Sequence, residues 1–254
     1  MKVKGSSFEG ILETHQLVKV YRKGSKPALN GLTVSIREGE VFGLLGPNGA
    51  GKTTAISIMT TLLKPTTGTI SVCGIDVLRS PARVRRLIGF VPQEIALYPN
   101  LTVRENLLFF GRIYGLQGKE LTRRISEFLE WVGLEESAGQ RVFACSGGMK
   151  RRANLAAGIL HKPKLLFLDE PTVGIDPQSR NLILERLSAM KDRTTMVYTT
   201  HYMEEAESLC SYVAIMDAGH IITEGVPEEI IRRHPDCENL EGLFLTLTGK
   251  QLRD

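Results

Sequence analysis

The stretch Val41-Phe42-Gly43-Leu44-Leu45-Gly46-Pro47-Asn48-Gly49-Ala50-Gly51-Lys52-Thr53-Thr54 is the most informative part of this sequence. It contains the pattern G-x-x-x-x-G-K-[ST] from Gly46 to Thr53, and the five mostly apolar residues before it predict a buried strand. A strand, a glycine loop and a helix in this order predict a phosphate site rather than a plain glycine-rich turn. The helix is indicated by apolar residues at helical spacing: Ala55, Ile56, Ile58, Met59, Leu62 and Leu63.

The residue types of this loop suit phosphate. Glycines let the backbone wrap closely and point its N–H groups inward, and the helix N-terminus adds a partial positive charge. We expect Lys52 to reach the β- and γ-phosphates and the Thr53 hydroxyl to bind Mg²⁺. The residues expected to hold the phosphates are Gly46, Pro47, Asn48, Gly49, Ala50, Gly51, Lys52, Thr53 and Thr54.

Length and composition are those of an ordinary globular protein. The 254 residues suit one large α/β domain or two small ones, and the hydrophobic content is 42%. No apolar run approaches the roughly 18 residues needed to cross a bilayer, and Met1-Lys2-Val3-Lys4-Gly5 lacks a signal-peptide core. We therefore expect a cytosolic chain that depends on another polypeptide for any membrane part.

Cysteine spacing and charge argue against several other classes of protein. No C-x-x-C pair occurs among Cys73, Cys145, Cys210 and Cys237, so neither a zinc site nor a disulfide framework is predicted. The net charge of +4 is mild. We interpret the basic clusters at 83–86, 123–124 and 150–152 as solvated helix surface rather than nucleic-acid or lipid contacts. No nucleic-acid partner is expected.

The hydrophobic pattern changes along the chain. Period-two alternation at 16–21 and 32–36 predicts antiparallel strands, and shorter strands are expected at 69–73 and 88–91. Between residues 94 and 143 the pattern is helical: Thr102 and Glu105 form a candidate capping box for a helix to Tyr114, and a second helix is predicted at 122–132. The remainder alternates as βαβ units do, with strands at 165–168, 195–200 and 212–216 and helices at 177–190 and 203–210.

Two acids, Asp169 and Glu170, end the apolar strand at 165–168. In doubly wound sheets, ligands bind at the carboxyl ends of the strands. Asp169 can hold the Mg²⁺ shell and Glu170 can polarise a water for attack on the γ-phosphate, because neighbouring strand residues point to opposite sides. The alternative is an acidic pair that only caps the next helix.

The segment Cys145-Ser146-Gly147-Gly148-Met149-Lys150-Arg151-Arg152 precedes another helical stretch. Its Ser-Gly-Gly builds an anion-attracting helix start, which alone would be an ordinary capped helix. Because one nucleotide rarely needs two such helix starts, we interpret this one as serving a nucleotide held by another copy.

Together these segments resemble the nucleotide-binding subunits of ATP-binding cassette (ABC) transporters, from about residue 12 to about residue 235. Residues 46–53 are similar to the Walker A motif, and residues 165–170 to Walker B with its catalytic glutamate. Ser146-Gly147-Gly148 matches the signature that closes over the partner's ATP, although Cys145 replaces the usual leucine. Cysteine is small and apolar enough for a packed position.

Four further positions are similar to functional positions of the family. Gln93 resembles the Q-loop glutamine, Gly174-Ile175-Asp176-Pro177 the D-loop, His201 the switch histidine, and Tyr21 the aromatic that stacks on adenine. Taken alone, each has a plain structural explanation. The resemblance implies catalytic roles for Lys52, Gln93, Glu170 and His201, Mg²⁺ ligation by Thr53, Gln93 and Asp169, and nucleotide contacts from Tyr21, Ser146, Gly147, Gly148 and Asp176.

The implied fold is α/β: a P-loop NTPase core with a mostly parallel sheet, an N-terminal antiparallel β subdomain and a helical insert. We expect a single ABC ATPase domain over residues 1–254, with the core and β subdomain at about 1–93 and 156–254 and the helical subdomain at about 94–155.

The implied function is hydrolysis of ATP to ADP and phosphate, coupled to transport through separate integral membrane permease subunits on whose cytoplasmic face the chain would sit. Two copies, or this chain and a related one, would pack head to tail around ATP. The sequences at 101–107, 148–152 and 200–206 together resemble those of cassettes of the drug- and antibiotic-export type. The alternatives are an iron–sulfur assembly ATPase and a non-catalytic ATP-binding regulator, of which the latter would be expected to lack Glu170 and His201.

Overall fold

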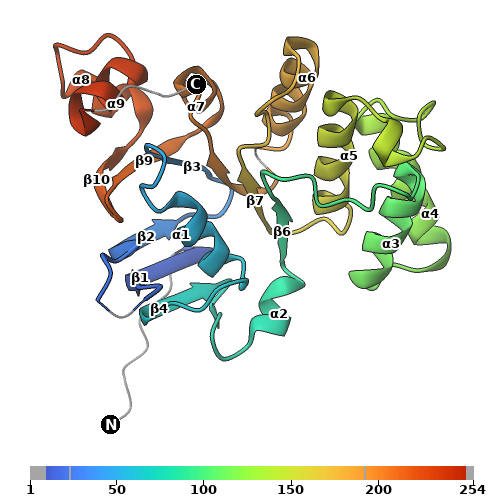
Figure 1. The fold of residues 1–254 in the computed structure, drawn as a ribbon, viewed down its shortest axis with the longest axis horizontal. Coiled ribbons are helices and arrows are strands. Elements are labelled where there is room, and N and C mark those ends of the chain that lie inside the picture. The colour runs from blue at the N-terminus through green and yellow to red at the C-terminus, as the bar shows by residue number, and fades with distance from the viewer. Residues whose placement is uncertain (1–9, 23, 192, 250–254) are drawn as a thin grey trace.

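Two β-sheets form the framework of the computed structural model, which describes residues 10–22, 24–191 and 193–249 (Figure 1). The segment Met1–Gly5 and both ends of the predicted 1–254 domain lie outside these residues. One sheet has four strands in the order β2-β1-β4-β5, and the other has six in the order β10-β9-β3-β8-β7-β6.

The smaller sheet is antiparallel, as the N-terminal pattern predicts. β2 buries Leu32, Val34 and Ile36 in strict alternation. The neighbouring strand begins earlier than the predicted 16–21 and ends before Tyr21, because a bulge at Gln16 (φ 48°) breaks the period of two. The strands are β1 (Leu12–Lys19), β2 (Leu29–Ile36), β4 (Thr67–Val72) and β5 (Ile75–Asp76).

The larger sheet has five parallel strands and the antiparallel edge strand β10. Every residue of β3, β7 and β8 is buried, which explains their continuous apolar sequences. The strands are β3 (Val41–Leu45), β6 (Ile88–Val91), β7 (Leu165–Asp169), β8 (Thr195–Thr199), β9 (Tyr212–Asp217) and β10 (His220–Gly225).

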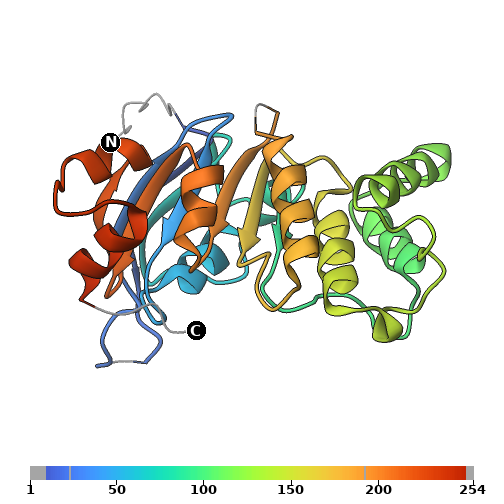
Figure 2. The ribbon, with the colours of Figure 1, turned by 90° about the horizontal axis from the view of Figure 1, so that it is seen from above.

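Two hydrophobic cores lie on opposite faces of the larger sheet. Phe42 and Leu44 of β3 belong to a core shared with α1 and the smaller sheet. Val41 and Leu45 point the other way, into a core covered by α6, α7 and α9 (Figures 1 and 2). The helices outside the insert are α1 (Lys52–Met59), α2 (Pro81–Arg85), α6 (Pro177–Ser188), α7 (Met203–Leu209), α8 (Pro227–Arg232) and α9 (Leu240–Thr248).

A third core belongs to the helical insert and spans Leu97 to Leu160. The predicted capping box is present: Thr102 Oγ1 accepts from Glu105 N at 3.1 Å, and Glu105 Oε2 accepts from Thr102 N at 2.8 Å. The last helix, α5, contributes to both this core and the core under α6. The boundaries of the helical subdomain at about 94–155 therefore stay a prediction. The elements are α3 (Val103–Ile113), α4 (Gly118–Trp131), the short 3₁₀ helix Val142–Ala144 and α5 (Gly147–Ile159).

Several short elements were not predicted from the sequence: β5, β10, α2, α8 and α9. The three helices have five to nine residues, and a run of that length gives only a weak apolar period. Among the described residues, none of the helices combines the length and the apolar character that crossing a membrane requires.

Helix α5 packs unusually close to β6 through two glycines. A Cβ on Gly158 would lie 2.5 Å from Val91 Cγ2, and one on Gly89 would lie 2.4 Å from Gly158 O. This contact joins the helical insert to the larger sheet.

We predict that Gly158→Ala lowers the free energy of unfolding by about 1–3 kcal/mol, although alanine is the better helix former. The added methyl group cannot fit unless α5 moves away from β6. Urea-induced unfolding followed by circular dichroism measures the change. Gly139→Ala is the control, because its Cβ would meet nothing within 4 Å. A Gly158→Ala protein as stable as the parent would contradict this account of the contact.

Candidate active site

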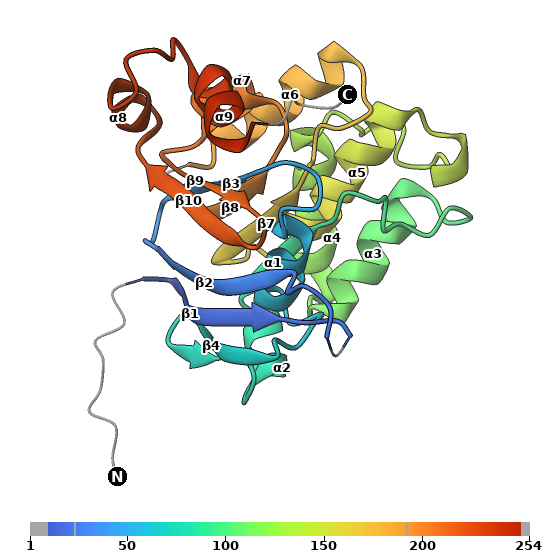
Figure 3. The same cartoon turned by 60° about the vertical axis from the view of Figure 1, so that its left-hand side comes forward.

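Four parallel strands deliver the predicted site residues to one edge of the larger sheet (Figures 1 and 3). β3 leads into the glycine loop 46–51, β6 into Gln93, β7 into Glu170 and β8 into His201. Residues far apart in the sequence therefore meet because parallel strands share one carboxyl edge.

The glycine loop closes around the Lys52 side chain. The Lys52 ammonium is buried and donates to Gly46 O at 2.6 Å and to Pro47 O at 3.3 Å. Gly51, with φ 108°, makes the turn into α1 that only glycine adopts readily. Burial lowers the pKa of Lys52, while the negative charges of Glu170 and Asp169 act in the opposite direction. A cation at a helix start inside a backbone loop is an arrangement suited to bind phosphate.

Glu170 is the centre of the polar cluster at this edge. Its Oε2 accepts a hydrogen bond from Gln93 Nε2 at 3.0 Å and lies 3.4 Å from His201 Nδ1. The backbone of Glu170 is left-handed, with φ 47°, and its N–H donates to Thr199 O and Thr199 Oγ1 at 3.1 and 3.0 Å. Such a conformation persists only where neighbouring groups hold it. The structure thus brings Gln93, Glu170 and His201 into direct contact.

Asp169 lies beside this cluster and is held by β8. Thr199 Oγ1 donates to Asp169 Oδ1 at 2.6 Å. Burial raises the pKa of Asp169, and the hydrogen bond from Thr199 opposes that shift. The Asp169 carboxylate, the Thr53 hydroxyl and the Gln93 amide are hard oxygen donors. Mg²⁺ is usually held by one or two carboxylates together with phosphates and waters, so this donor set suits Mg²⁺.

Tyr21 lies next to the glycine loop although it is far from it in sequence. Its hydroxyl is 3.1 Å from Thr54 Oγ1, and the residue is 61% exposed. The Lys19 ammonium lies 5.4 Å from the centroid of the Tyr21 ring, and the exposed part of the ring can cover a flat ligand bound beside the start of α1.

The Ser146–Gly148 segment and Asp176 lie together, at the starts of α5 and α6. Ser146 Oγ accepts from Met149 N, and Asp176 Oδ1 accepts from Ser179 N. A Cβ on Gly148 would lie 2.0 Å from Ser179 Oγ, so the two helix starts touch. Both helices lie on the opposite side of β7 from α1 (Figures 1 and 2). The fold separates these residues from the glycine loop of the same chain.

Cys145, the residue before this segment, is buried in the core of the helical insert. Its Sγ lies 3.5 Å from Arg141 O. Cysteine thus occupies a packed position here, as its small and apolar side chain allows.

Arg151 corrects one expectation from the sequence. The sequence predicts solvated surface for the basic run 150–152, but Arg151 is buried and donates to Gln93 O at 2.5 Å and to Val173 O at 3.2 Å. It ties α5 to the Gln93 loop and to the segment after Glu170. A signal was available: Gly148, Arg151 and Leu155 share the buried face of α5 at helical spacing.

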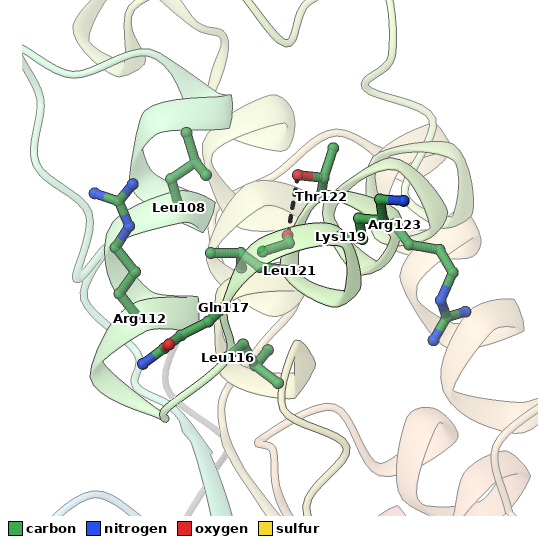
Figure 4. A pocket seen from close by; sticks show the side chains of 9 residues that line it. Leu108, Arg112, Leu116, Gln117, Lys119, Leu121, Thr122 and Arg123 are labelled. Carbon is green, nitrogen blue, oxygen red and sulfur yellow. Dashed lines mark hydrogen bonds between the residues drawn. The ribbon is translucent and has the colours of Figure 1, made fainter.

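A pocket on the helical insert is separate from this site (Figure 4). It lies where Leu108 and Arg112 of α3 meet Leu121 and Thr122 of α4. None of the predicted site residues lines it. This pocket therefore belongs to the helical insert and not to the polar cluster around Glu170.

Comparison with known proteins places this site in a family. The ABC transporter family matches residues 29–173. The linearmycin resistance ATP-binding protein of Bacillus subtilis (strain 168) is 48% identical over 94% of this chain and 76% of its own length. The Nod factor export ATP-binding protein I of Burkholderia orbicola (strain AU 1054) is 44% identical over 87% of this chain and 73% of its own length.

Solved structures agree with this assignment. An ATP-binding subunit of an ABC transporter superposes with a TM-score of 0.85 at 30% identity, over 94% of this chain and 99% of that one. A dimeric ATP-binding cassette in a post-hydrolysis state, bound to ADP and Pi, gives 0.78 at 28% identity, over 85% and 98% of the two chains.

This chain belongs to the ABC transporter family. The predicted fold and class are confirmed: a P-loop NTPase core with an antiparallel β subdomain and helices, in an ATP-hydrolysing subunit coupled to transport.

We predict that Thr199→Val raises the Mg²⁺ concentration for half-maximal ATPase activity about 10- to 100-fold. Valine has the same shape but cannot donate to Asp169, a predicted Mg²⁺ ligand, and the loss of a bond that orients a metal ligand typically has an effect of this size. Steady-state ATPase rates across a Mg²⁺ titration measure it, and Thr199→Ser, which keeps the hydroxyl, is the control. An unchanged Mg²⁺ requirement in Thr199→Val would mean that Thr199 does not orient Asp169.

Proposed function

We propose that this chain is the ATPase subunit of an ABC exporter and that it holds ATP between two copies. The observation that supports this is that two helices with starts suited to bind an anion, α1 at Lys52 and α5 at Ser146, lie on opposite sides of β7 in one chain (Figure 1). If a second copy packs head to tail, the glycine loop of one copy and the Ser146–Gly148 segment of the other act on the same nucleotide. A related cassette, 28% identical to this chain, is a dimer.

The glycine loop and Tyr21 bind ATP. Lys52 and the N–H groups of the loop stabilise negative charge on the β- and γ-phosphates. The adenine ring stacks on Tyr21, which is exposed and whose hydroxyl lies beside Thr54 Oγ1. Ser146, Gly147, Gly148 and Asp176 contact the γ-phosphate and the glycine loop of the other copy.

Glu170 orients the attacking water. Gln93 and His201 both approach Glu170 Oε2, at 3.0 and 3.4 Å, so each can respond to a γ-phosphate by exchanging this contact. Gln93 also borders the helical insert through Arg151. The state of the nucleotide can therefore tilt the insert against another protein.

Thr53, Gln93 and Asp169 hold Mg²⁺. The ion supplies positive charge that neutralises the phosphate oxygens when it is bound. Thr199 keeps the Asp169 carboxylate in place for this role.

The cargo path belongs to separate integral membrane permease subunits, and the chain sits on the cytoplasmic face beside them. The names of two relatives, for linearmycin resistance and for Nod factor export, support export over the alternatives of iron–sulfur assembly and a non-catalytic regulator. Copurification from solubilised membranes with an integral membrane protein tests this part. Copurification with iron–sulfur assembly proteins instead would favour that alternative.

We predict that Glu170→Gln traps an ATP-bound dimer. The amide cannot support attack by water, so ATP stays and continues to join the two copies. Size-exclusion chromatography with light scattering, in ATP and Mg²⁺, should show a dimer that returns to the monomer in ADP. ATPase activity should fall at least about 100-fold, the scale of losing a general base.

The matched control is Glu228→Gln, the same chemical change on the exposed start of α8. It should hydrolyse ATP as the parent does. Hydrolysis by Glu170→Gln at the parent's rate would remove Glu170 from the proposed role.

A further inference from the structure

A buried carboxylate outside the proposed catalytic set gathers four hydrogen bonds. The Glu205 side chain, on α7, is only 2% exposed. Its Oε2 accepts from Thr172 Oγ1 at 2.9 Å, Tyr198 OH at 2.6 Å and Thr200 Oγ1 at 2.9 Å, and its Oε1 accepts from Arg180 Nε at 2.6 Å. A buried charge is costly unless it is paired and hydrogen-bonded. Because the loss of any of these four hydrogen bonds would leave the carboxylate less well satisfied, Glu205 holds all four partners in position.

These four partners come from the segments that surround the catalytic edge. Thr172 lies two residues after Glu170, and Arg180 lies on α6, whose N-cap is Asp176. Tyr198 and Thr200 come from β8 and its end. Burial and the nearby negative charge of Glu205 raise the pKa of Tyr198 well above its usual value, so the phenol remains a donor.

Glu205 controls the residues on both sides of His201. Thr200 Oγ1 donates to Glu205 and accepts from Tyr202 N at 2.9 Å. The hydroxyl does both because it has one donor proton and two acceptor lone pairs, and its bond to Glu205 fixes the position of the oxygen. His201 therefore sits in a short turn whose two flanking residues are bonded to each other and anchored to α7.

A second connection from Glu205 to His201 runs through the side chains of Arg180 and Tyr202. The Arg180 guanidinium lies over the Tyr202 ring, with Cζ 3.9 Å from the ring centroid, and the Tyr202 and His201 ring centroids are 4.2 Å apart. The Glu205–Arg180 ion pair thus holds the ring against which the imidazole packs. The imidazole in turn lies 3.4 Å from Glu170 Oε2.

We propose that Glu205 is a positioning residue for ATP hydrolysis: through Thr200, Arg180 and Tyr202 it holds His201 beside Glu170. This inference rests on the role proposed above for His201. Because α6 also carries Asp176, Glu205 ties the His201 turn to the helix start that would face the second copy.

Glu205→Gln tests the proposal. The neutral amide loses the ion pair with Arg180 and replaces one acceptor by a donor. We expect kcat to fall about tenfold or more, while KM for ATP changes less than about twofold. The kcat value is expressed per nucleotide site, and the sites are counted with a fluorescent ATP analogue. Glu204→Gln is the matched control, because Glu204 is the exposed neighbour on the same helix. It should retain the parent's kcat.

A double variant distinguishes positioning of His201 from a general structural effect. If Glu205 acts through His201, adding Glu205→Gln to His201→Ala should lower kcat by less than about twofold further. Losses that multiply would overturn the proposal. If His201→Ala alone keeps the parent's activity, the role proposed for His201 is wrong. If His201→Ala is impaired but Glu205→Gln has the parent's kcat, only the inference about Glu205 is wrong.

Tyr202 provides a test that does not disturb the buried carboxylate. Tyr202→Leu removes the ring between Arg180 and His201 and should lower kcat several-fold, whereas Tyr202→Phe keeps the ring and should restore most of the activity. Equal activity of the leucine and phenylalanine variants would contradict the path through Tyr202. This test remains decisive if Glu205→Gln does not fold.

Discussion

The site depends on one constraint, the parallel alignment of β3, β8, β7 and β6 with their carboxyl ends at the same edge. Each strand contributes one element of the chemistry directly after its last residues. If any one of these strands ran in the opposite direction, the polar residue after it would lie at the opposite edge of the sheet. The nearly complete burial of β3, β7 and β8 makes the alignment rigid, because both faces are packed against helices or the second sheet.

The charged groups of the site are held by hydrogen bonds from fixed protein groups. Lys52 is bonded to loop carbonyls, Asp169 to Thr199, and Glu205 to four donors. Arg151 is bonded to carbonyls from two loops, and its Nε has no partner in the described part of the chain. These groups keep one geometry at some cost in stability, which is typical of preorganised active sites.

Local features were predictable where neighbouring residues carry them. The capping box at Thr102 and the continuous strands could be predicted because their signals lie within a few residues. The prediction of β1 was displaced because a bulge at Gln16 interrupts its alternation, and α8 and α9 were missed because short helices have little periodicity. Arg151 was misjudged because burial among carbonyls depends on which loops lie above its helix.

By itself, the sequence determined the phosphate loop and the list of residues resembling a known site, because each motif is a contiguous set of side chains with its own local geometry. Only the tertiary structure decided which of them meet. It joined Gln93, Glu170 and His201 around one oxygen, and it set α5, which follows Ser146, apart from α1 across β7 (Figure 1). It also made Glu205 a hub, since its donors come from separate segments that only the folded sheet and helices bring within bonding distance.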